Sequence, residues 1–169
     1  IPPNTPVINI GALVKYTGDP LGDNFLRQPQ TDTATVMTAG PLLAKTIVGT
    51  NQGHTSGYNV AIGEIITYSL TITVPEGVTG NAVLTDTLDA GLAFVTNTVA
   101  SSLSSLVTLT GTVTPVIDPS GARAVFNLGN ITNANTNAPI SGTVTITYPV
   151  VVLNTPNNTR GATRHNSVA

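Results

Sequence analysis

The chain has 169 residues, no cysteine and only 8% charged residues, with a formal net charge of −2. This length is enough for one well-buried domain, or for one domain with an appendage. The lack of cysteine excludes a disulfide-stapled miniprotein and a cysteine-based metal site. The few basic residues form no cluster that would neutralise a run of phosphates, so we expect no nucleic-acid partner. No apolar run reaches the roughly 18 residues that a membrane helix needs, so we expect no membrane insertion.

Apolar and polar residues alternate along much of the chain, which is the pattern of a β-strand. In chain order, strands are predicted at 11–17, 31–38, 42–48, 66–74, 81–87, 105–117, 122–128 and 143–148. Turn-forming residues separate them at 75–77, 89–91 and 118–121, and in the Asn-rich stretch 127–137. No window has sustained helical periodicity. Many short strands with frequent turns predict an all-β protein, an antiparallel β-sandwich.

Two neighbouring segments carry a family resemblance. Gly63-Glu64 opens the strand 66–74, and an Asp-x-Leu-x-x-Gly-Leu-x-Phe corner follows at 86–94. This combination resembles the DUF11 family of repeat modules in bacterial and archaeal surface proteins, which is related to the isopeptide-forming D2 domains of fimbrial subunits. The resemblance implies an immunoglobulin-like sandwich, a secreted or cell-surface location, and a structural role.

The same families indicate how the chain is organised. Their modules begin with a Lys-Thr strand, which 43–48 matches, and close with a strand that opens like Asn-x-x-Ala. Residues 166–169 resemble the start of that closing strand, whereas 9–16 resemble the whole of it and 31–36 the return strand. We therefore expect an N-terminal β-hairpin arm at 1–40, built from the closing strands of a preceding or neighbouring module. A DUF11-like β-sandwich should follow at 41–169.

Two interpretations of this arm stay open. The chain is either one repeat of a longer tandem array, or a subunit whose arm completes the sandwich of another copy. In the second case unpaired strand edges would accept a donor strand, and the head-to-tail contact would build fibres. A hairpin that folds back on its own domain is a third arrangement.

The resemblance to D2 domains also implies a chemistry, a spontaneous bond between a Lys of the first strand and an Asn of the last. Lys45 matches the Lys, Asn166 the Asn, and Asp86 the carboxylate that promotes the reaction. We expect Lys45 to be buried by its apolar neighbours Leu42, Leu43, Ile47 and Val48, and burial would lower its pKa. Glu64 is the alternative carboxylate but is expected to be exposed at the start of its strand. Alternatively, the Lys is a strand-edge cation and the Asp satisfies a turn.

Other kinds of site have weaker support. The oxygen-rich turn 19–24 resembles a calcium loop but lacks the EF-hand spacing. His54 and His165 lie in polar contexts and are expected to be solvated. No nucleophile elbow, zinc-protease motif or phosphate loop occurs, so we expect no enzyme, no cofactor and no metal site. A glycan site would use loop 49–58, where Tyr58 is the obvious exposed aromatic.

The sequence thus favours a structural subunit or repeat of an extracellular fibre or surface assembly. It would polymerise with other copies of itself or adjoin neighbouring repeats. The alternative is a glycan- or host-binding module of a large cell-surface adhesin.

Overall fold

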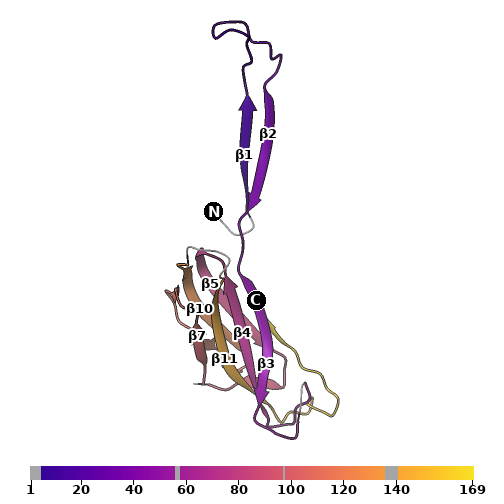
Figure 1. The fold of residues 1–169 in the computed structure, drawn as a ribbon. Coiled ribbons are helices and arrows are strands. Elements are labelled where there is room, and N and C mark those ends of the chain that lie inside the picture. The colour runs from indigo at the N-terminus through magenta and orange to yellow at the C-terminus, as the bar shows by residue number, and fades with distance from the viewer. Residues whose placement is uncertain (1–4, 56–57, 97, 136–140) are drawn as a thin grey trace. The chain divides into compact units, whose positions relative to one another are not determined.

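The computed structural model describes residues 5–55, 58–96, 98–135 and 141–169, and the chain forms two compact units, Ile1–Gly40 and Pro41–Ala169. The described part of the first unit is a β-hairpin, in which β1 (Pro6–Leu13) pairs antiparallel with β2 (Gln30–Met37) (Figure 1). Across these described ranges the secondary structure is all β, and no helix that could cross a membrane occurs.

The second unit contains two antiparallel sheets (Figure 1). One sheet has the order β3-β4-β11-β6, with β7 also paired to β11, and the other has the order β12-β5-β10-β8, with β9 also paired to β10. The strands are β3 (Leu42–Thr50), β4 (Ile65–Val74), β5 (Gly77–Leu88), β6 (Leu92–Phe94), β7 (Ala100–Leu103), β8 (Val107–Leu109), β9 (Val116–Ile117), β10 (Arg123–Asn133), β11 (Gly142–Val152) and β12 (Asn166–Val168). The predicted all-β sandwich is therefore confirmed.

The core lies between the sheets because the alternating strands each turn one apolar face inward. Strand β4 buries its aliphatic residues and Tyr68, and the paired strand β11 does the same with Tyr148, which confirms the faces predicted for these two strands. Phe126 of β10 is fully buried against them from the other sheet. Since a buried side chain of this size contributes about 1.5–3 kcal/mol, this apolar core dominates the stability of a chain with so few charges.

Several predicted boundaries were wrong, among them those of the strand predicted at 81–87, which spans Gly77–Leu88. The strand predicted at 105–117 is broken into β8, which pairs with 131–133 of β10, and β9, which pairs with 124–125. Between them Gly111 packs closely against the backbone of 127–129, where the left-handed Gly129 (φ 66°) departs from strand geometry. The turn predicted at 127–137 is strand as far as Asn133, whose buried amide donates to the Val74 carbonyl at 3.1 Å. The remainder of that predicted turn includes 136–137, which lie outside the described residues.

The first strand also begins and ends earlier than predicted. It spans Pro6–Leu13 and not 11–17, because the side chain of Asn24 binds the backbone that follows. Asn24 accepts the N–H of Tyr16 at 2.9 Å and donates to the carbonyl of Val14 at 3.0 Å. These bonds form a loop where strand pairing would otherwise continue.

Candidate cross-linking site

Lys45 projects from β3 into the sandwich, although not for the reason expected. Its side chain is only 11% exposed, and its backbone pairs with Leu70 of β4. The neighbours Leu42 and Val48 do not cover it, since they are 70% and 57% exposed on the outer face. Alternation along the strand places Lys45 and Ile47 on the inner face instead, so the covering groups come from other strands.

Asp86 of β5 is the direct partner of Lys45. The Lys45 Nζ lies 2.5 Å from Oδ2 of Asp86, whose side chain is fully buried. The hydroxyl of Tyr148 on β11 donates a hydrogen bond to the same Oδ2. The amine also lies 5.2 Å from the ring centroid of Tyr68 and 5.9 Å from that of Tyr148. The fold thus brings two of the three predicted residues into contact within an aromatic cage.

Asn166 begins β12, the strand beside the one that carries Asp86. It pairs with Leu88 of β5, and Val168 pairs with Asp86. Both polar atoms of the Asn166 side chain are buried and complete no hydrogen bond with the residues that the structure describes, and the same is true of Oδ1 of Asp86. Burial and the Asp86 charge raise the pKa values of the Tyr68 and Tyr148 hydroxyls, and the nearby Asn166 amide partly offsets the rise. Buried polar groups without partners are rare, so this amide requires an explanation.

The electrostatics of the site favour neutral groups. Burial lowers the pKa of the Lys45 amine, against the opposing effect of Asp86. Burial likewise raises the pKa of the Asp86 carboxyl, although the hydrogen bonds from Lys45 and Tyr148 partly offset the rise. Both shifts make proton transfer from the ammonium to the carboxylate easier than in water. An uncharged amine beside a protonated acid is the state that amide chemistry requires.

The prediction that Glu64 is exposed was wrong, since the residue is only 1% exposed. Its carboxylate accepts the Ala61 N–H at 2.6 Å, the Thr55 hydroxyl at 2.5 Å and the Thr50 hydroxyl. Burial alone would raise the pKa of Glu64, but these hydrogen bonds and the nearby His54 lower it. Its oxygens are therefore occupied by Thr50, Thr55 and Ala61, and it holds these three residues together.

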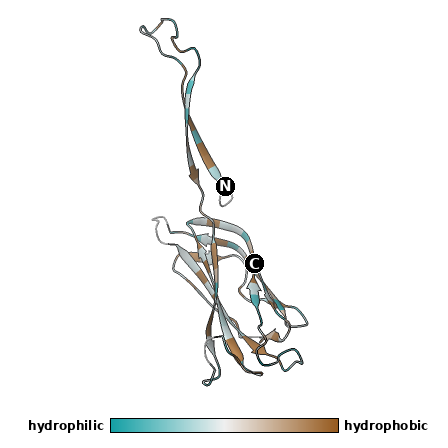
Figure 2. Ribbon diagram, turned by 90° about the vertical axis from the view of Figure 1, so that its right-hand side faces the viewer, coloured by the Kyte–Doolittle hydropathy of each residue, from teal (hydrophilic) through white to brown (hydrophobic). Residues whose placement is uncertain are grey.

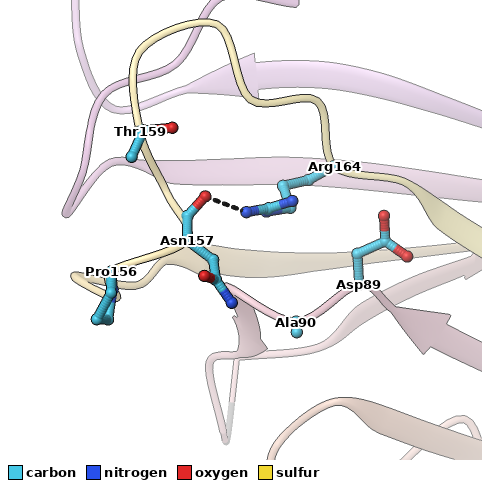
Figure 3. Close-up of a pocket in the computed structure, with 6 residues that line it drawn as sticks. All are labelled: Asp89, Ala90, Pro156, Asn157, Thr159 and Arg164. Atoms are coloured by element: carbon cyan, nitrogen blue, oxygen red, sulfur yellow. Dashed lines mark hydrogen bonds between the residues drawn. The ribbon is translucent and has the colours of Figure 1, made fainter.

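The connection from β11 to β12 determines where Asn166 lies, and a surface pocket marks it (Figure 3). Asn158 donates to the carbonyls of Gly91 and Leu153, both at 2.8 Å, and Arg164 donates to the side-chain oxygen of Asn158 at 2.7 Å. Gly91 has φ 103°, and a Cβ there would lie 2.4 Å from Asn158, so only glycine fits. The pocket is lined by Asp89, Ala90, Pro156, Asn157, Thr159 and Arg164. Its polar groups hold the β11–β12 connection in place, and the lining residues do not form a catalytic arrangement.

The remaining sequence candidates form no cluster. His165 is exposed and lies 3.2 Å from Asp89, while Tyr58 is 90% exposed. Within the described ranges no group of three or more His, Cys, Asp or Glu side chains is placed to hold a metal ion. Tyr148 is the functional candidate that sequence reasoning missed, because it was assigned only to the core; the polar hydroxyl on a buried apolar face was the available signal.

Comparison with known proteins identifies the fold. No protein-family model matches the chain, and no curated protein matches it. Among solved structures, the pilus backbone protein RrgB from Streptococcus pneumoniae matches with 20% identity and a TM-score of 0.53, over 77% of this chain and 51% of that one. The full-length major pilin RrgB of the same organism matches with 20% identity and a TM-score of 0.52, over 79% of this chain and 24% of that one.

The chain has a pilin-like fold. It spans about half, or less, of the length of these two pilus proteins. At this level of identity the likeness concerns the fold alone, and the narrower resemblance to the DUF11 family stays a prediction.

Proposed function

We propose that the chain is a structural subunit or repeat of an extracellular, cell-surface fibre, strengthened by a covalent bond between Lys45 and Asn166. The observation that carries this proposal is the buried Lys45–Asp86 pair beside an Asn166 amide that has no hydrogen-bond partner among the described residues. The pilin-like fold is consistent with it. The protein would act by assembly and resistance to force, without turnover of a substrate.

The proposed bond forms by displacement of ammonia. The Lys45 ammonium first transfers a proton to Asp86, which yields a neutral amine and a neutral acid. The Nζ lone pair then attacks Cγ of Asn166, while the acid polarises the amide oxygen. A proton from Nζ passes to the amide nitrogen, the Cγ–Nδ2 bond breaks, and ammonia leaves. The products are one isopeptide bond, one ammonia molecule and a protonated Asp86, so atoms and charges balance.

The bond predicts a loss of mass in the denatured chain. The intact mass should be lower than that of the sequence by one ammonia molecule, and a proteolytic digest should contain a peptide that joins the Lys45 and Asn166 segments. Lys45→Ala and Asn166→Ala cannot form the bond, so each variant should have the full mass of its own sequence. Lys15→Ala is the matched control, because Lys15 is the other lysine of the chain, and its variant should still lose ammonia. An unmodified wild-type mass would reject the cross-link.

We further propose that copies join head to tail through the hairpin arm. Both hairpin strands are exposed along their whole length, and apolar residues lie along them (Figure 2). Ile8 and Ile10 are 58% and 64% exposed, and Val36 is 65% exposed. A two-stranded hairpin with no cover is marginally stable at best. In the sandwich, β12 and Ala169 pair with β5 only at 85–88, so the rest of that edge could accept a strand.

Assembly is tested by negative-stain electron microscopy of the full chain beside a variant that lacks residues 1–40. We expect fibres from the full chain and single particles from the truncated one. Fibres from both would contradict the role of the arm. Single particles from both would indicate instead one repeat of a tandem array.

A binding module of an adhesin is the second candidate, and the 90% exposure of Tyr58 is the observation that favours it. Tyr58 lies in sequence between Thr55 and Ala61, which both donate to Glu64, and an exposed aromatic ring is a common contact for a sugar face. Saturable binding of a glycan by a stable monomer, lost in Tyr58→Ala, would support this function.

A further inference from the structure

Tyr148 carries a hydroxyl into the buried core of the sandwich. The residue is only 1% exposed, and its ring lies 5.3 Å from that of Phe94 and 6.0 Å from those of Tyr68 and Phe126. A phenylalanine would serve the packing equally well, and a buried hydroxyl costs free energy unless it is hydrogen-bonded. The bond that it makes, to Oδ2 of Asp86, is therefore the feature that packing does not explain.

This bond makes the two oxygens of the Asp86 carboxyl different. Oδ2 accepts hydrogen bonds from both Lys45 and Tyr148, whereas the buried Oδ1 has no partner among the described residues. The Asn166 amide has none either. Two donors from two different strands, β3 and β11, thus hold one edge of the carboxyl and leave the other edge free.

We propose that Tyr148 is a positioning residue for the cross-linking reaction, which holds Asp86 so that Oδ2 faces the Lys45 amine and Oδ1 remains available to the Asn166 amide. This inference rests on the proposed function and assigns a role within it. In the reaction, Oδ2 takes the proton of the Lys45 ammonium. The protonated Oδ2 then donates a hydrogen bond to the amide oxygen, and Oδ1 accepts one from the amide N–H, while Nζ attacks Cγ. A proton from Nζ passes to the amide nitrogen, and ammonia departs. Burial and the Asp86 charge raise the pKa of the Tyr148 hydroxyl, so it stays protonated and remains a donor throughout.

The test compares the rates of ammonia loss. Chains recovered unfolded from inclusion bodies are diluted into native buffer, quenched with denaturant at intervals and weighed by mass spectrometry. Tyr148→Phe should fold, because it keeps the ring, and should cross-link about tenfold to a hundredfold more slowly, the usual effect of misplacing a reacting group. Tyr16→Phe removes a hydroxyl from an exposed ring of the first unit, which contributes nothing to the cross-linking site, so its rate should stay within about twofold of wild type.

A second measurement separates positioning from packing. In the Asn166→Ala background, where no bond can form, the titration of the Asp86 carboxyl is followed by carbon NMR. Lys45, Tyr68 and Tyr148 are the titratable groups that act on it. Tyr148→Phe removes a donor that favours the ionised carboxyl, so the pKa of Asp86 should rise further, whereas a mere loss of packing would leave it unchanged.

The outcomes are distinct. Slower cross-linking together with a raised Asp86 pKa in Tyr148→Phe supports the positioning role. A wild-type rate in a folded Tyr148→Phe chain, or an unmoved Asp86 titration, overturns this role but leaves the cross-link intact. No ammonia loss from the unmodified chain rejects the cross-link itself, and with it the role of Tyr148.

Discussion

Asp86→Asn should abolish ammonia loss and destabilise the sandwich by about 3 kcal/mol, because the variant leaves a buried Lys45 cation without its counter-charge. Asparagine keeps the shape of the side chain but can neither take the proton of Lys45 nor act as an acid. The mass of the denatured chain reports the first effect. Urea unfolding in the Asn166→Ala background reports the second effect, because neither chain can then be cross-linked. Asp23→Asn, at an exposed position, makes the same change of charge and should alter neither the loss of ammonia nor the free energy of unfolding.

The same variant should depend on pH in a defined direction. Without Asp86, burial acts unopposed and holds the pKa of Lys45 below its ordinary value of 10.5. The unfolded chain then binds more protons than the folded chain between the lowered pKa and 10.5, so the free energy of unfolding should rise with pH across that window. A flat profile would show that Lys45 stays solvated in the variant.

The stability of the wild type should also depend on the bond. Lys45 and Asn166 belong to β3 and β12, which are edge strands of the two sheets. A covalent tie between them would close the loop from Lys45 to Asn166, about 120 residues, for which chain entropy gives a stabilisation of about 5 kcal/mol. Because edge strands are the ones that can peel away first, this tie would also oppose unfolding under force.

Glu64→Ala should lower the free energy of unfolding by about 3 kcal/mol. The substitution leaves the Ala61 N–H and the hydroxyls of Thr50 and Thr55 without their acceptor. Urea unfolding measures the loss of stability, and faster hydrogen exchange at the Ala61 amide locates it in the 50–61 segment. Because the pKa of Glu64 is lowered in the fold, its contribution is complete above the ordinary value of 4.5 and is lost as pH falls through the folded pKa. The deficit of the variant should therefore shrink in acid.

Glu76→Ala is the matched control, since Glu76 is exposed in the turn between β4 and β5. It should unfold at nearly the wild-type denaturant concentration. Equal effects of the two substitutions would show that the hydrogen bonds of Glu64 contribute little. If Glu64→Ala also removed glycan binding without affecting fibres, the binding function would depend on the 50–61 segment and the assembly would not.

The sequence by itself determined the class of fold and the two central strands. Strict alternation over 66–74 and 143–148 specifies which side chains enter the core, because a strand has only two faces and one must be buried. It also supplied Lys45, Asp86 and Asn166 as candidates, through resemblance to proteins of known chemistry. Their roles remain predictions, although the fold places Lys45 and Asp86 in contact.

Only the tertiary structure decided which groups contact the buried polar side chains. Glu64 is buried where Thr50, Thr55 and Ala61 donate to both of its carboxylate oxygens, which no local pattern around Glu64 indicates. The hydroxyl of Tyr148 donates a hydrogen bond to Asp86 on the other sheet, 62 residues away in sequence. Local sequence specifies the direction of a side chain, whereas its partners depend on long-range packing. That packing determines which buried polar groups are hydrogen-bonded and which pKa values are shifted.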